Sequence, residues 1–167
     1  FVPIGMLGVT NVALGVSPKL GVRTFGELVA KSKTTRINIA LPNTSALIVN
    51  DVLARQGGSA MMPVPYKGGP TALTDYLGGH VDAIIDSVYV IQQQVTAGTM
   101  VGIGVASLTQ SDLLPGVKPL ADQGLPGFEV AGWFILFAPQ GTPADVLARL
   151  NAALKKVSCS FTAGRVT

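Results

Sequence analysis

Short apolar runs that alternate with helix-like segments most constrain the fold of this 167-residue chain. The runs "INIAL" (37–41), "VDAIID" (81–86) and "MVGIGVAS" (100–107) have the length and composition of buried strands. The segments between them show apolar residues at helical spacing, and two of these segments end at paired glycines. Strands that alternate with helices form crossover units, so the sequence predicts an α/β fold. We expect a mostly parallel central sheet with helices on both faces.

Local signals set the limits of the remaining elements. Residues 9–16, "VTNVALGV", are strand-like, and "TFGE" opens a helix in which Thr24 caps the first turn and Glu27 reaches back to it. The run "MMPVPY" (61–66) predicts an edge strand, because its two prolines cannot donate to a ladder. A Pro- and Gly-rich stretch, 108–127, predicts a loop around one short helix, before a strand within 128–139 and a final helix from Thr142.

Composition and charge exclude several classes of function. The net charge of +3 comes from 12 basic and 9 acidic residues that are scattered along the chain, so no nucleic-acid partner is expected. Cys159 and His80 are the only residues of their types, which leaves too few soft ligands for a zinc site. We therefore expect no metal and no cofactor. No run approaches the roughly 20 apolar residues of a membrane span.

Two loops carry the groups that bind small anions. "PNTS" contains Asn43, Thr44 and Ser45, and "KGGPT" contains Lys67, Gly68, Gly69 and Thr71. Each loop leads from a predicted strand into a helix N-terminus, where free backbone N–H groups and the helix dipole favour a carboxylate. In open parallel sheets, ligands lie beside such loops at the carboxyl ends of the strands.

An alternative interpretation is purely structural. Asn43 or Thr44 then caps its helix, Gly68 and Gly69 make a tight turn, and Lys67 is a solvated surface residue. The serines, aspartates and His80 lack the neighbours that a nucleophile or a general acid–base pair needs, so the sequence predicts no catalytic residues.

Longer motifs resemble a known family. "FVPIGMLG", "VPYKGGPTALTDYLGGHVDAIID", "LPGVKPLADQGLPGFEVAGWFILFAPQGTP" and "LARLNAALKK" look like the solute receptors of tripartite tricarboxylate transporters, the Bug family. The resemblance covers residues 1–157 and implies a lobe of the type II periplasmic-binding-protein fold. It also implies a periplasmic receptor, not an enzyme, that binds a small carboxylate in an interlobe cleft and presents it to membrane transporter subunits.

The resemblance also predicts how the chain is organised. Residues 1–8 would form a hinge crossover, 9–129 the second lobe and 130–157 a return segment of the first lobe, and the atypical tail 158–167 departs from the family pattern. On this interpretation the chain is a fragment that lacks most of the first lobe, and its uncovered apolar segments favour self-association.

Site residues follow from the same comparison. The "PYKGGPTA" turn matches well, whereas the loop around Thr44 is shorter than its family counterpart and lacks the family's glycines. Asp86 matches a family aspartate near the cleft, where it could orient a hydroxyl, an amine or a bridging water. Its alternative role is that of an N-cap for the following helix.

A second class of function shares this architecture. The effector-binding domain of a transcriptional regulator can have the same two lobes, but a helix-turn-helix segment would precede it.

Overall fold

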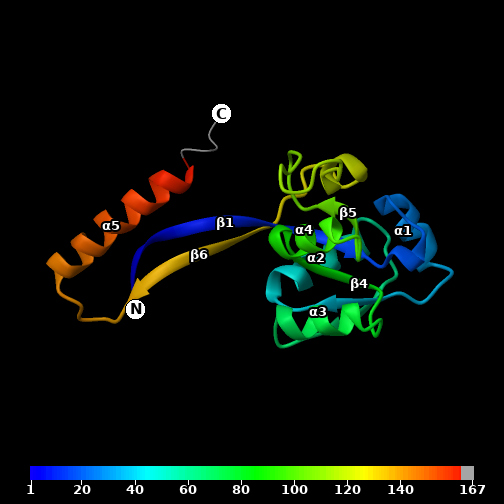
Figure 1. The fold of residues 1–167 in the computed structure, drawn as a ribbon, viewed down its shortest axis with the longest axis horizontal. Coiled ribbons are helices and arrows are strands. Elements are labelled where there is room, and N and C mark those ends of the chain that lie inside the picture. The colour runs from blue at the N-terminus through cyan, green and yellow to red at the C-terminus, as the bar shows by residue number, and fades with distance from the viewer. Residues whose placement is uncertain (163–167) are drawn as a thin grey trace. The chain divides into compact units, whose positions relative to one another are not determined.

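The computed structural model describes residues 1–162, with the side chains of residues 1–156 (Figure 1). Unit 2 spans Asn11–Gly132, and unit 1 combines Phe1–Thr10 with the residues from Trp133 onward. The elements, in chain order, are β1 (Val2–Val16), η1 (Pro18–Leu20), α1 (Phe25–Ser32), β2 (Asn38–Leu41), α2 (Thr44–Arg55), β3 (Met62–Pro65), α3 (Gly69–Leu77), β4 (Ala83–Ser87), α4 (Val88–Thr96), β5 (Val101–Val105), η2 (Leu120–Gln123), β6 (Ala131–Ala138) and α5 (Ala144–Thr162).

The sheet of unit 2 has the strand order β3-β2-β4-β1-β5. β2 is parallel to both β3 and β4, and β3 lies at the edge, as its prolines predict. β1 is antiparallel to both of its neighbours, β4 and β5. Four of the five strands on this path therefore run in one direction, and β1 runs against them.

The direction of β1 differs from the prediction, because crossover units would place β1 parallel to its neighbours. Val16, at the end of β1, and Ile39, near the start of β2, both lie opposite Ala83 of β4. The connection that contains the eight-residue α1 thus starts and finishes at the same end of the strands, and it does not cross to the other end of the sheet. Because the connection returns the chain to the edge it left, β2 must run opposite to β1.

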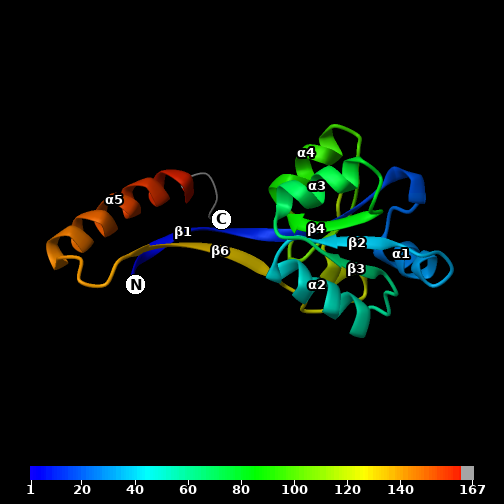
Figure 2. The same cartoon turned by 90° about the horizontal axis from the view of Figure 1, so that it is seen from below.

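Helices cover both faces of this sheet, which confirms the predicted α/β layering (Figure 2). On one face, side chains of α1 and α2 pack into a core that includes Leu28, Val49 and Ile39. On the other face, side chains of α3 and α4 form a second core that includes Tyr76, Ile91 and Ile84. Alternate residues of β4, Ile84 and Ile85, enter different cores, as the two-residue period of a strand requires.

Unit 1 contains β6, α5 and the first residues of β1. The side-chain amide of Asn151 in α5 donates a hydrogen bond to the carbonyl of Ile4 in β1. A Cβ atom added to Gly5 would lie 2.8 Å from Leu154 Cδ2, so α5 packs closely on this strand. Within the described part of the chain, no helix has both the length and the apolarity that a membrane crossing needs.

The predicted tail at 158–167 falls partly within the last helix. α5 continues to Thr162, beyond residue 157, where the predicted return segment ends. Residues 163–167 lie outside the described residues.

Candidate functional site

The carboxyl ends of three strands meet at one edge of the sheet in unit 2. Leu41 of β2 lies opposite Pro65 of β3, and Ala40 lies opposite Ile84 of β4, so these strands end at nearly the same level. Each strand leads directly into a helix, and the N-termini of α2, α3 and α4 therefore lie at this edge. The first N–H groups of a helix have no partner within the helix, so this edge offers donors and partial positive charge.

In the first predicted turn, one side chain caps a helix, and two hydroxyls make no bond to another described residue. Asn43 is the N-cap of α2, and its Oδ1 atom accepts a hydrogen bond of 2.9 Å from the backbone N–H of Ala46. Thr44 is exposed and Ser45 half-buried, and neither hydroxyl bonds to another described residue. The capping interpretation is thus correct for the Asn43 side-chain oxygen, whereas the two hydroxyls have no partner among the described residues.

The second turn lies at the start of α3. Gly68 is the N-cap, and its backbone is extended, a conformation open to any residue. Thr71 donates its hydroxyl hydrogen to the Gly68 carbonyl, 3.2 Å away, so this hydroxyl is already engaged as a donor. Lys67 is exposed and makes no ion pair with the residues that the structure describes. Gly69 is the first residue of α3.

Asp86, a residue of β4, lies beside this turn. Its side chain is buried, with 7 % exposure, and a Cβ atom added to Gly69 would lie 3.0 Å from its Oδ2 atom. Its Oδ1 atom accepts a hydrogen bond of 2.7 Å from the Ser87 N–H, whereas Oδ2 has no partner among the described residues. Burial raises the pKa of the Asp86 carboxyl, and the hydrogen bond from Ser87 lowers it by less.

The alternative role that the sequence predicts for Asp86 is that of a helix N-cap. Ser87, not Asp86, is the N-cap of α4, and the Asp86 carboxylate bonds to the N–H of that cap residue. An N-cap side chain would bond instead to an N–H two or three residues farther on. The N-cap interpretation of Asp86 is therefore wrong.

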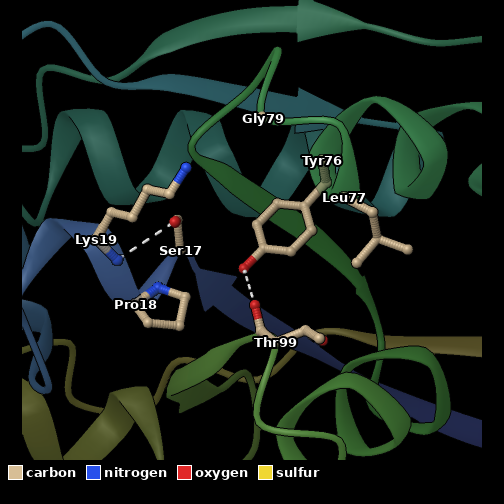
Figure 3. Close-up of a pocket in the computed structure, with 7 residues that line it drawn as sticks. All are labelled: Ser17, Pro18, Lys19, Tyr76, Leu77, Gly79 and Thr99. Atoms are coloured by element: carbon tan, nitrogen blue, oxygen red, sulfur yellow. Dashed lines mark hydrogen bonds between the residues drawn. The ribbon is translucent and has the colours of Figure 1, made fainter.

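Sequence reasoning did not predict a pocket at the opposite edge of the sheet. This pocket, of about 300 Å³, is lined by Ser17, Pro18, Lys19, Tyr76, Leu77, Gly79 and Thr99 (Figure 3). The Tyr76 hydroxyl donates to the Thr99 carbonyl, 3.1 Å away, and burial raises the pKa of Tyr76 to about 12. These residues come from three short segments (17–19, 76–79 and 99) that share no motif, so only the fold brings them together.

Metal ligation finds no support in the described part of the chain. No group of three or more His, Cys, Asp or Glu residues there lies close enough together to hold a metal ion.

Known proteins resemble this chain over most of its length. A UPF0065 protein from the tcbD-tcbE intergenic region of Pseudomonas sp. (strain P51) is 35 % identical over 161 residues, which cover 93 % of this chain and 48 % of that protein. BugT of Bordetella pertussis is 29 % identical over 154 residues, 90 % of this chain and 47 % of BugT. The chain thus spans about half the length of these relatives.

Solved structures share the fold. The periplasmic binding protein BugD superposes with a TM-score of 0.84 at 29 % identity, covering 93 % of this chain and 53 % of BugD. MatC from Rhodopseudomonas palustris, solved with bound malate, gives a TM-score of 0.79 at 28 % identity, covering 94 % of this chain and 55 % of MatC. These likenesses confirm the predicted lobe of a periplasmic binding protein.

The family assignment rests on a match along nearly the whole described chain. The model of the tripartite tricarboxylate transporter family receptor matches residues 2–162. This match, together with the Bug relatives, confirms the resemblance that the sequence motifs indicated. The chain belongs to the tripartite tricarboxylate transporter receptor family.

Proposed function

We propose that this chain belongs to an extracytoplasmic solute receptor that works in the periplasm and binds a small carboxylate. Residues 11–132 form one wall of an interlobe cleft, and the ligand lies at the N-termini of α2 and α3. The receptor presents the ligand to the membrane subunits of a tripartite transporter, and it catalyses no reaction.

One observation carries the binding proposal. The N-termini of α2 and α3 lie at the same edge of the sheet, because Leu41 and Pro65 are paired neighbours at the ends of parallel strands. Helix N-termini bind carboxylates through free N–H groups and the helix dipole. The free hydroxyls of Thr44 and Ser45 add two donors beside them.

The relatives support the same chemistry. MatC, which shares this fold at 28 % identity, was solved with bound malate, a small dicarboxylate. A match to a family of transporter receptors also favours the receptor over the effector-binding domain of a regulator.

Amide chemical shifts measured during a ligand titration test this proposal. We expect succinate, at millimolar concentration, to shift the backbone amides of residues 44, 45, 68, 69 and 71 in the 167-residue chain. Putrescine, a diamine with the same number of carbons, is the control of opposite charge, and it should leave these amides unchanged. Shifts confined to other regions, or none with any dicarboxylate, would contradict the proposed site.

A further inference from the structure

The pocket at the opposite edge of the sheet has no part in the proposed function. It measures about 300 Å³ and lies beyond the end of β1, beside the ends of α3 and α4 (Figure 3). A hydrogen bond holds one of its walls, because the Tyr76 hydroxyl donates to the Thr99 carbonyl, 3.1 Å away. This wall is therefore formed without a ligand.

One side of the pocket carries two hydrogen-bond donors that have no acceptor. The ammonium group of Lys19 forms no ion pair with a described residue. The Ser17 hydroxyl oxygen accepts a hydrogen bond of 3.4 Å from the Lys19 backbone N–H, and its own hydrogen has no acceptor among the described residues. None of the residues that line the pocket is acidic, so the charge of Lys19 is not balanced there.

An alternative role for Lys19 is to neutralise the C-terminal end of α3. The backbone carbonyls of residues 74, 75 and 76 accept hydrogen bonds of 2.9–3.0 Å from the N–H groups of residues 78, 80 and 79. The helix end therefore has its own hydrogen-bond donors. Its dipole amounts to about half an elementary charge, so part of the charge of Lys19 stays available to an anion.

The other side of the pocket is apolar. Figure 3 shows the Tyr76 ring and the Leu77 side chain across the pocket from Lys19 and Ser17. Leu77 is 54 % exposed, so an apolar group that packed against it would remove leucine surface from water. The pocket thus has one side that suits an anion and one side that suits an apolar group, the usual combination in sites for small molecules.

We propose that this pocket binds an aromatic carboxylate, with the carboxylate at Lys19 and Ser17 and the ring against Tyr76 and Leu77. A flat ring matches the face or edge of the Tyr76 ring, and aromatic pairs are favourable beyond the area that they bury. The pocket lies at the end of α3, whereas the candidate carboxylate site lies at its start. The inference therefore does not depend on the proposed function.

Three small probes test the two sides of the pocket separately. Benzoate has a ring and a charge, acetate has the charge without the ring, and benzyl alcohol has the ring without the charge. We expect benzoate to shift the backbone amides of Gly79 and Thr99 in the 167-residue chain at millimolar concentration. Acetate and benzyl alcohol should bind there about fivefold more weakly or less tightly still, because each lacks one of the two contacts.

Variants assign each contact to a residue. Lys19→Gln should weaken benzoate binding about fivefold, to the level of benzyl alcohol. Lys33→Gln makes the same change of charge at an exposed residue that follows α1, and it should bind benzoate as the wild type does. Leu77→Ala should weaken benzoate binding and leave acetate binding unchanged. Lys19 and Leu77 are both exposed, so we expect both variants to fold.

The titrations separate this inference from the proposed function. Acetate or benzyl alcohol that binds at Gly79 and Thr99 as tightly as benzoate would overturn the inference, as would unchanged benzoate binding in Lys19→Gln. Benzoate that shifts only the amides of residues 44, 45, 68, 69 and 71 binds at the candidate site, and the inference then fails while the proposed function stands. An absence of any shift at Gly79 and Thr99 overturns the inference in the same way.

Discussion

The Oε1 atom of Gln123 accepts a hydrogen bond from the backbone N–H of Phe25, 2.9 Å away and 98 positions earlier in the sequence. The Nε2 atom of the same side chain donates to the carbonyls of Ile103 and Lys118. One amide group thus joins the start of α1, strand β5 and the loop before η2. The side chain of Gln123 thereby satisfies one backbone N–H and bonds to two backbone carbonyls.

Replacing Gln123 by alanine tests this junction. Gln123→Ala leaves one backbone N–H and two carbonyls without their side-chain partner, so we expect the free energy of unfolding to fall by about 1–3 kcal/mol. Urea denaturation measures the change. The matched control is Gln93→Ala on the exposed face of α4, expected within about 0.5 kcal/mol of wild type. Equal effects in the two variants would show that Gln123 is only a surface residue.

We expect alanine at two glycine positions to change the free energy of unfolding in opposite directions. A Cβ atom at Gly57 would lie 2.8 Å from the Leu53 carbonyl oxygen and 2.5 Å from Phe25 Cζ, whereas Gly26 has open space around it within α1. Gly57→Ala should lower the free energy of unfolding by about 1–3 kcal/mol. Gly26→Ala should raise it by roughly 0.4–1 kcal/mol, because alanine is less free than glycine in the unfolded chain. Urea denaturation of both variants checks the signs.

Local signals predicted most of the elements correctly. Thr24 caps α1, with its hydroxyl accepting from the Glu27 N–H at 3.3 Å, and Glu27 accepts from the Arg23 N–H at 2.7 Å. These contacts span three or four residues, so a short window of sequence contains them. The direction of β1 depends instead on how α1 packs, and the Gln123 junction on residues far apart in the chain. No local pattern contains either.

The site was predictable to a lesser extent. Loop composition and family motifs predicted the two turns and Asp86 as candidate site residues, and they stay candidates. Composition could not decide that Asn43 uses its side-chain oxygen as a cap, or that Asp86 keeps one buried oxygen unpaired beside Gly69. Both depend on side-chain geometry, which only the folded structure supplies.

Asp86 predicts how stability changes with pH. Burial raises the pKa of its carboxyl in the folded state above the ordinary value for an aspartate. Between the ordinary pKa and the raised one, the folded chain therefore binds more protons than the unfolded chain. The free energy of unfolding therefore falls as pH rises through the raised pKa. Asp86→Asn lacks this contribution, so wild type should lose stability relative to the variant between acid and neutral pH. Urea denaturation at a series of pH values measures the difference, and a difference that moves the other way would contradict the raised pKa.

Strand β6 predicts self-association. Its side chains alternate between two faces, and large apolar residues are exposed on both: Trp133 at 63 % and Phe137 at 48 % on one face, Phe134 at 59 % on the other. We expect a concentration-dependent dimer in sedimentation velocity, because apolar patches of this kind favour association. The double variant Trp133→Ser/Phe137→Ser should weaken it, whereas Leu77→Ser, at an exposed apolar residue of unit 2, should not. A wild-type chain that stays monomeric at all concentrations would contradict the prediction.

In the turn before α2, we expect the stability of the fold and the binding of a carboxylate to depend on different residues. Asn43 holds the first turn through its bond to Ala46, so Asn43→Ala should lower the free energy of unfolding by about 1 kcal/mol. The Thr44 and Ser45 hydroxyls make no bond within the described chain, so their removal should change stability little. Each donor lost to the ligand should instead weaken binding by about 1 kcal/mol, roughly fivefold.

Urea denaturation and titration of the amide shifts with a dicarboxylate, applied to the same three variants, separate the two effects. We expect Thr44→Ala and Ser45→Ala to weaken binding while the folded chain keeps its stability. Thr71→Ala is the comparison within the other turn, because its hydroxyl already donates to Gly68 and has no second hydrogen for a ligand. Binding that is indifferent to Thr44 and Ser45 would show that this turn only caps α2, and it would move the carboxylate to the backbone N–H groups of α3.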